Sequence, residues 1–260
     1  MNGIIGMMTY QDACFAIEIC RIVFAAVCGD LVLFAAKAVY MRLPAHWLCD
    51  FDEQPWEMHM PGFRGQRCKV FCAGLWSVLL IFIVRVQHEL EKAVEDGAVL
   101  IAVVDIVLTA GVCICAVVIA FGDRDYMIIP DQLVMAMGIL VVIFRLSSAI
   151  ISSGSSEFLS ADMIEAVHQI LFGAFIGGSL MMITGFAGLI SGNGFAAGFG
   201  DIKLMAVCGA MVGENVYIMY VLIVMMSGIY FSYCIVRGKV RSSEGLPLAP
   251  WICGAMLLCM

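Results

Sequence analysis

The chain has 260 residues, of which 63% are hydrophobic and 13% are charged, and its formal net charge is −7. Soluble domains carry about 25% charged residues, so this composition excludes an ordinary soluble protein and indicates a membrane protein with several spans. The acidic residues are scattered and the sequence has no basic stripe, which argues against a nucleic-acid partner. The N-terminus, MNGIIGMMTYQDAC, has no basic region and no small-residue cleavage site, so we expect no cleaved signal peptide.

Apolar segments follow one another along the chain, and eight of them are predicted to span the membrane. They are 14–40, 68–86, 98–121, 132–150, 165–190, 202–213, 216–236 and 246–260. The sixth and eighth fall short of the roughly 20 residues that a span needs, which suits a thinned bilayer or shielding by neighbouring helices. In the fifth, Gly173 and Gly177 have the spacing that lets helix backbones approach closely in lipid. The sequence therefore predicts an all-α, polytopic membrane protein with a single transmembrane domain over 1–260.

Some polar residues lie inside these spans. We expect Asp105 in the third span to face the interior of the bundle, with Arg145 in the fourth as a candidate partner. Such residues can also mark a hydrophilic path for water or substrate. Most of the twelve cysteines fall within apolar runs, where we expect them to behave as small hydrophobic side chains rather than as a disulfide framework.

Lysine and arginine residues in the connecting segments predict the orientation. Only Arg85 and Lys92 lie in loops on one side of the eight-span arrangement, and nine lie on the other side. The nine are Arg42, Arg64, Arg67, Lys69, Arg124, Lys203, Arg237, Lys239 and Arg241. This excess predicts that both termini lie outside the cytoplasm. It places the loop 41–67, the turn 122–131 and the loops 191–203 and 237–245 inside.

Two acidic motifs are thereby predicted at the same cytosolic face. The first, GDRDYMIIPD at 122–131, contains Asp123, Asp125 and Asp131, and Pro130 should redirect the chain there. The second, GFGD, ends at Asp201. Two acids brought together in a low-dielectric cleft cannot both ionise cheaply, so one keeps its proton. Such a pair can activate water and protonate a carbonyl oxygen, which is the chemistry of aspartic peptidases.

Each motif alone has a simpler interpretation. A charged loop is usually just solvated, and Asp201 could be no more than a helix cap. The combination of both motifs on one face favours catalysis. The site would need no metal, and the sequence contains neither H-E-x-x-H nor C-x-x-C.

These motifs resemble those of the type IV prepilin peptidases, bacterial leader peptidases related to the archaeal preflagellin peptidases. AAGFGDIKLMA (196–206) is similar to their G-x-G-D-x-K-L signature, and GDRDYMIIPD to the block in which an Asp is followed by Pro-Asp. EGLPLAPWICGAM (244–256) resembles their final-helix motif. GDLVLFAAKAVYMRLP (29–44) resembles their first span, which also ends in R-L-P.

The resemblance implies a GxGD-type aspartic endopeptidase in the bacterial inner (cytoplasmic) membrane. It would remove the leader peptide from type IV pilin-like precursors at the cytosolic face, and the apolar helix of the substrate would bind partly through membrane lipid. Asp123 and Asp201 would be the catalytic pair. Because a helix start favours an anion, Asp201 would be the ionised member.

The resemblance also implies supporting roles around the pair. Asp131, next to Pro130, would be a structural or substrate-orienting acid. Gly198 and Gly200 would let the loop turn tightly against the cleft. Lys203 would pair with a carboxylate or with lipid phosphate, and Asp125 has no role assigned by the resemblance and is expected to be solvated.

Bifunctional members of this family carry a cytosolic insertion with two C-x-x-C pairs, thought to bind zinc, and methylate the new N-terminus with S-adenosylmethionine. Here the loop 41–67 is reduced, and the cysteines near it are Cys49, Cys68 and Cys72. A tetrahedral zinc site completed by His46 or His59 is arithmetically possible. A shortened loop with residual cysteines is the simpler interpretation, so we expect a peptidase without zinc, S-adenosylmethionine or methyltransferase activity.

Two other functions remain open from the sequence. In a proton- or cation-coupled transporter, Asp105, Asp123 and Asp201 would form a relay, although the spans show no convincing inverted repeat. A protein with the same fold but no activity is the other, and the intact acids at 123 and 201 argue against it.

Overall fold

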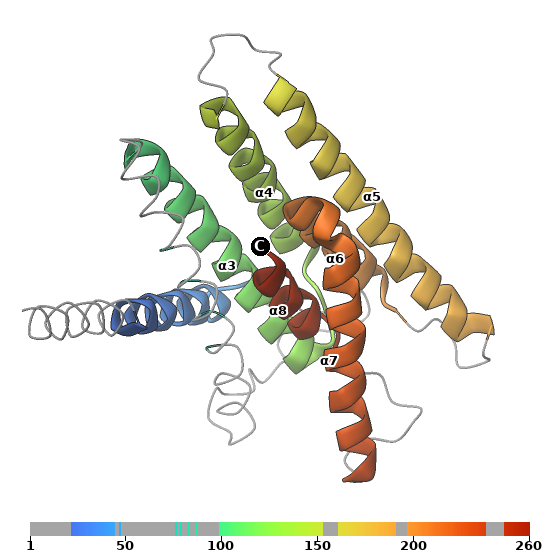
Figure 1. The fold of residues 1–260 in the computed structure, drawn as a ribbon. Helices are drawn as coiled ribbons and strands as arrows, with labels where there is room; N and C mark the ends of the chain where they lie inside the picture. Colours follow the sequence, from blue (N-terminus) through green and yellow to red (C-terminus); the bar gives the residue numbers. More distant parts are fainter. Residues whose placement is uncertain are drawn as a thin grey trace, which may run out of the picture.

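The computed structural model describes residues 22–44, 47, 76, 79, 83, 87, 99–152, 161–190, 197–237 and 247–260 (Figure 1). Over these residues the protein is helical and contains no strand. The elements are a helix Ile22–Tyr40, α3 (Val99–Tyr126), α4 (Asp131–Ser152), α5 (Ala161–Ile190), α6 (Phe199–Val212), the 3-10 helix η3 (Gly213–Asn215), α7 (Val216–Val236) and α8 (Ala249–Cys259). The predicted all-α class is confirmed for this part of the chain.

Among the described residues, five helical stretches are long and apolar enough to cross a membrane, which indicates a multi-pass membrane protein. They are Ile22–Tyr40, Val103–Tyr126, Asp131–Ile150, Ala161–Ile190 and Phe199–Val236. The last of these combines α6, η3 and α7, and α8 is a shorter apolar helix. The predicted span 68–86 lies mostly outside the described residues. Eight spans, and termini outside the cytoplasm, therefore stay predictions.

The end of α3 differs from the sequence-based expectation. The predicted span ended at residue 121, but α3 continues to Tyr126, so Asp123 lies in a helix and not in a turn. The helix ends where Met127 adopts a positive φ of 57° and donates its N–H to the carbonyl oxygen of Asp123 at 2.8 Å. Pro130 stands directly before α4, and its carbonyl oxygen accepts the first N–H bonds of that helix.

The closest helix contact joins α5 and α6. A Cβ atom added at Gly173 would collide with the backbone of Gly209, and one at Gly177 would lie 2.6 Å from the carbonyl oxygen of Met205. Glycine alone permits this approach, because any side chain would separate the two backbones. The predicted role of Gly173 and Gly177 in close packing is confirmed, and α6 is fixed against α5 over most of its length.

The short helix α8 fills the centre of the bundle. Figure 1 shows it between α3 and α7, and it also packs against α6. Ile252, Cys253 and Met256 have no exposed surface. The helix α8 packs against α6, which carries the fully buried Cys208, and the thiols of Cys208 and Cys253 are both free. These cysteines therefore behave as small buried side chains, as predicted.

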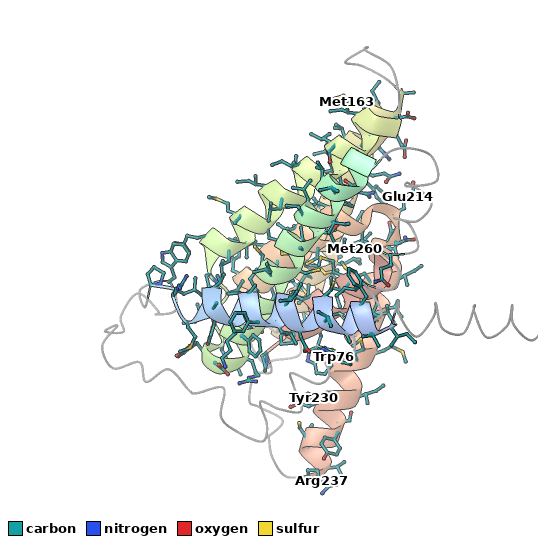
Figure 2. All side chains as sticks on the ribbon, turned by 90° about the vertical axis from the view of Figure 1, so that its left-hand side faces the viewer. Trp76, Met163, Glu214, Tyr230, Arg237 and Met260 are labelled. Carbon is teal, nitrogen blue, oxygen red and sulfur yellow. The ribbon has the colours of Figure 1, made fainter. Side chains whose placement is uncertain are left out.

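One end of the bundle collects the termini of several described helices. The helix α3 ends there, and α4, α6 and α8 begin there; we call it the Asp123 end. The same end of the molecule holds the end of α7, with Arg237, whereas Met163 near the start of α5 lies at the opposite end (Figure 2).

Candidate active site

Asp123 lies in the last turn of α3 and is 5% exposed. Its Oδ2 atom accepts a hydrogen bond of 2.8 Å from the backbone N–H of Ala249, the first residue of α8. The first N–H groups of a helix have no partner within the helix. Because Pro250 follows and has no N–H, the Ala249 N–H is a natural donor for a carboxylate. The start of α8 thus holds the Asp123 side chain in place.

Asp201 lies in the first turn of α6 and is 9% exposed. Its Oδ2 atom accepts a hydrogen bond of 2.9 Å from the backbone N–H of Gly198, the residue that caps α6. This is the reciprocal half of a capping box, in which the third helical residue binds back to the cap. The other oxygen, Oδ1, is buried and has no hydrogen-bond partner among the described residues. A buried carboxylate oxygen without a partner is costly, so this atom is suited to bind a water or a substrate group.

The two acids meet at the Asp123 end of the bundle. They are far apart in the sequence and come from different helices, yet their carboxyl groups interact electrostatically. Asp201 starts α6, and Asp123 is bonded to the start of α8, so each accepts one N–H at the amino end of a helix. The helix-start argument that singled out Asp201 as the ionised member therefore applies to both and no longer distinguishes them.

Gly198 and Gly200 serve the site by leaving room. Gly198 has φ −64° and ψ 153°, an extended conformation that any residue adopts, so the expectation of a tight glycine turn is wrong there. A Cβ atom at Gly198 would instead lie 3.1 Å from Oδ2 of Asp201. One at Gly200 would lie 3.0 Å from Cβ of Ile129, in the segment between α3 and α4. Small residues here let α6 approach the α3–α4 connection.

Lys203 and Asp131 join the start of α6 to the start of α4. The Lys203 Nζ atom lies 2.8 Å from Oδ1 and 2.7 Å from Oδ2 of Asp131. Of the two expected partners for Lys203, the structure shows the carboxylate. Both side chains are substantially exposed, at 40% for Lys203 and 63% for Asp131. Asp131 is thus an outer ion-pair partner and is separate from the buried pair of acids.

Asp125 is not solvated, contrary to expectation. Its side chain is 7% exposed and accepts hydrogen bonds from Nε of Arg124 at 2.8 Å and from the hydroxyl of Tyr40 at 3.2 Å. Tyr40 ends the helix Ile22–Tyr40, so this contact ties the first described helix to the last turn of α3. Sequence reasoning missed Tyr40, although it lies in the 29–44 segment that carries the resemblance.

The predicted pairing of Asp105 with Arg145 is wrong. Arg145 donates to Oε1 of Gln169 on α5 at 3.0 Å, and Oδ1 of Asp105 is buried without a hydrogen-bond partner among the described residues. The arithmetically possible zinc ligands Cys49, Cys68 and Cys72 lie outside the described residues, so the expectation of no zinc stays a prediction. Within the part of the chain that the structure describes, no group of three His, Cys, Asp or Glu side chains has the arrangement of a metal site.

The sequence around the two acids matches a known protein family. A family model described as "type IV leader peptidase family" matches residues 110–233. The matched segment includes both buried acids, the part of α3 from residue 110 and all of α6, and it ends before α8. No curated protein and no solved structure matches the chain significantly. Residues 110–233 of this chain are therefore similar to the type IV leader peptidase family.

Proposed function

We propose that the chain is a membrane aspartic endopeptidase that removes the leader peptide from type IV pilin-like precursors, with Asp123 and Asp201 as the catalytic pair. The match of residues 110–233 to a leader peptidase family supports peptidase activity. The observation that carries the aspartic assignment is the burial of two carboxyl groups, from α3 and α6, that interact at one end of the bundle. Two acids in such a site share a proton more readily than they both ionise.

The chemistry of a shared proton accounts for the reaction. The ionised member takes a proton from a water molecule, which attacks the scissile carbonyl carbon, while the protonated member donates its proton to the carbonyl oxygen. Collapse of the tetrahedral intermediate breaks the C–N bond as the leaving nitrogen receives a proton from the pair. The backbone donors at Gly198 and Ala249 each hold one carboxylate oxygen, and Oδ1 of Asp201 remains available to the water.

The position of the pair fits a substrate that is itself anchored in the membrane. Asp123 lies three residues before the end of an apolar stretch that closes at Tyr126, and Asp201 lies two residues after the start of one that opens at Phe199. A bond cut there would sit where a substrate's transmembrane helix meets its leader. We place this end at the cytosolic face, in accordance with the lysine and arginine distribution, in a bacterial inner membrane. We propose further that the chain acts without zinc, S-adenosylmethionine or methyltransferase activity, because its loop 41–67 is short.

A transporter relay is harder to build on this geometry. Asp105 and Asp123 lie on the same helix, 18 residues apart, which separates them by about 27 Å along the axis. Direct proton transfer requires hydrogen-bond contact, or contact through one water. Asp105 therefore cannot pass a proton straight to the pair, and the peptidase remains the better explanation of Asp123 and Asp201.

The deciding experiment replaces each acid by its neutral isostere. Purified protein in detergent is incubated with a pilin-like precursor that carries a basic leader, and the shortened product is measured. We expect Asp123→Asn and Asp201→Asn each to abolish cleavage. When catalytic residues act as a unit, removing one of them costs nearly the whole activity. Asp162→Asn, an exposed aspartate at the opposite end of the bundle, is the matched control and should cleave normally. Full activity in either of the first two variants would refute the assignment.

A further inference from the structure

Arg145 is a cation inside an apolar helix, and no acidic side chain among the described residues forms an ion pair with it. Its Nη2 atom donates to Gln169, a neutral amide, and its Nε atom is buried without a hydrogen-bond partner among the described residues. Two ion pairs in the described part of the chain join Arg124 with Asp125 and Lys203 with Asp131, and neither involves Arg145. A charge at membrane depth costs several kcal/mol unless it is compensated, and it marks a functional site by default.

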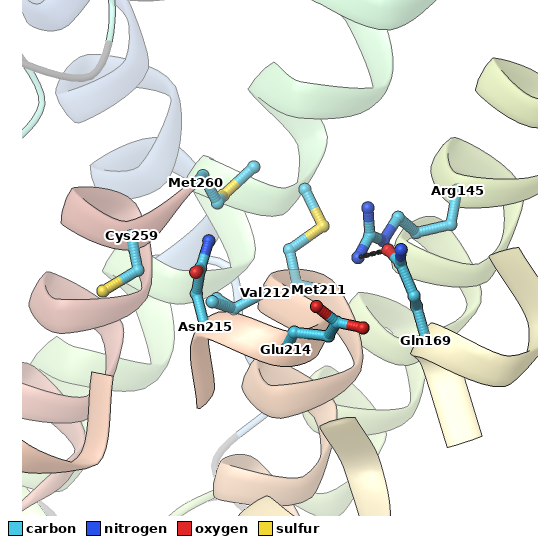
Figure 3. Close-up of a pocket in the computed structure, with 8 residues that line it drawn as sticks. All are labelled: Arg145, Gln169, Met211, Val212, Glu214, Asn215, Cys259 and Met260. Atoms are coloured by element: carbon cyan, nitrogen blue, oxygen red, sulfur yellow. Dashed lines mark hydrogen bonds between the residues drawn. The ribbon is translucent and has the colours of Figure 1, made fainter. Parts of the chain in front are cut away.

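Arg145 lines a polar pocket of about 250 Å³. Gln169 lies beside it, and Glu214 and Asn215 of η3 form the facing wall (Figure 3). The turn that carries this wall depends on Gly213, whose φ of 65° is left-handed. A Cβ atom there would lie 2.5 Å from Nη2 of Arg145. Glycine at this position therefore lets the guanidinium group lie against the backbone of the turn.

The pocket lies at the far end of α6 from the two acids. Arg145 is 14 residues after the start of α4, about 21 Å along its axis, whereas the hydrocarbon core is about 30 Å thick. The helices α4 and α5 both extend past the pocket, so it is recessed below their ends. In Figure 2, Glu214 and Met260 lie between Met163 at one end and Arg237 at the other. A headgroup of the leaflet opposite the Asp123 end can reach this depth where the short α6 thins the bilayer.

The charges in the pocket define the ligand. Arg145 and Glu214 line the same space, yet they form no ion pair with each other. Gln169, held by Glu165 at 2.9 Å, uses its oxygen on the guanidinium group, which keeps that group oriented. A ligand that carries both an anion and a cation would compensate the two charges together. The guanidinium group of Arg145 suits a phosphate oxygen, and the exposed carboxylate of Glu214 suits an ammonium group.

We propose that this pocket binds the phosphoethanolamine headgroup of a phospholipid, with the phosphate on Arg145 and the ammonium group on Glu214. The site is separate from the proposed active site and does not depend on the peptidase function. The same headgroup chemistry is present in soluble phosphoethanolamine. Because the pocket is recessed within apolar helices, a lipid is the source that the geometry favours.

The test measures how ligands stabilise the purified protein in detergent. A ligand that binds the folded state raises the thermal unfolding midpoint in proportion to its affinity and concentration. The probes are short-chain phosphatidylethanolamine, short-chain phosphatidylglycerol and soluble phosphoethanolamine. We expect phosphatidylethanolamine to raise the midpoint most. Arg145→Gln should weaken its apparent affinity by about tenfold or more, because a charge-assisted hydrogen bond is lost. Arg42→Gln, an exposed arginine away from the pocket, should change nothing.

Glu214→Gln provides a second variant in case Arg145→Gln does not fold, since Glu214 is exposed. This variant should lose the preference for phosphatidylethanolamine over phosphatidylglycerol, because only the former has an ammonium group. Equal stabilisation of the unaltered protein by both lipids would overturn the proposal, as would undiminished affinity in Arg145→Gln. Stabilisation by soluble phosphoethanolamine alone would support the binding chemistry and identify a soluble ligand as its source. None of these measurements involves cleavage, so they stand apart from the proposed peptidase activity.

Discussion

Substituting Gly177 by alanine tests whether the α5–α6 contact sets the position of Asp201. The new Cβ atom would lie 2.6 Å from the carbonyl oxygen of Met205, which is one helical turn after Asp201 on α6. An ordinary carbon–oxygen contact is about 3.3 Å, so the two helices must separate by about 0.7 Å. A misplacement of about 1 Å can reduce a catalytic rate about a hundredfold, and we therefore expect cleavage to fall by about tenfold or more.

The same substitution should also destabilise the fold. Overpacking costs about 1–3 kcal/mol, against a gain of at most about 1 kcal/mol from the better helix propensity of alanine. Gly228→Ala is the matched control, because Gly228 lies in α7 with no atom within 4 Å of its added Cβ. Cleavage rate and thermal unfolding midpoint are measured for both variants in detergent. If Gly177→Ala matches Gly228→Ala in both measurements, the α5–α6 contact does not position Asp201.

Three further predictions concern the outer ion pair, the metal and the product. Lys203→Met should lower the free energy of unfolding by less than about 1 kcal/mol, because the ion pair with Asp131 is exposed; a larger loss in thermal unfolding would contradict this. A chelator should leave cleavage unchanged, since the proposed site uses carboxylates and water; loss restored by zinc would implicate Cys49, Cys68 and Cys72. Product incubated with enzyme and S-adenosylmethionine should not gain the mass of a methylene group at its new N-terminus, and mass spectrometry decides this.

The helices and the meeting of the two acids could be predicted from the sequence. The apolar runs predict the ends of most described helices within a few residues. This works because a span needs length and hydrophobicity more than any particular side chain. The lysine and arginine count then put the segments around Asp123 and Asp201 on one side of the bundle, as the structure has them. The G-x-x-x-G step on α5 identified a close helix contact, although it could not name α6 as the partner.

The details of the site could not be predicted, because they depend on contacts between distant segments. The run Arg124–Asp125–Tyr126 looks like a loop by polarity, but Tyr40 and Arg124 satisfy Asp125 and keep the turn helical. The bond from Ala249 to Asp123 joins residues 126 positions apart and uses a backbone N–H, which leaves no signal in residue type. The nearby prolines of LPLAP mark the start of α8, and they are the one sign in the sequence of where this N–H donor lies.

The short α6 explains how one helix serves both ends of the bundle. Its 14 residues give a length of about 21 Å, which is less than the thickness of the hydrocarbon core. A span of ordinary length would carry its first turn or its last beyond the other helices. Because α6 stops at Gly213, its first turn can hold Asp201 against the end of α3 while its last turn closes the pocket beside Arg145. Two glycines of α5 hold α6 close near both of its ends. Gly177 lies opposite Met205, nearer the start of α6, and Gly173 lies opposite Gly209, nearer its end. The geometry of the acidic pair and the depth of the polar pocket therefore depend on the same packing contact.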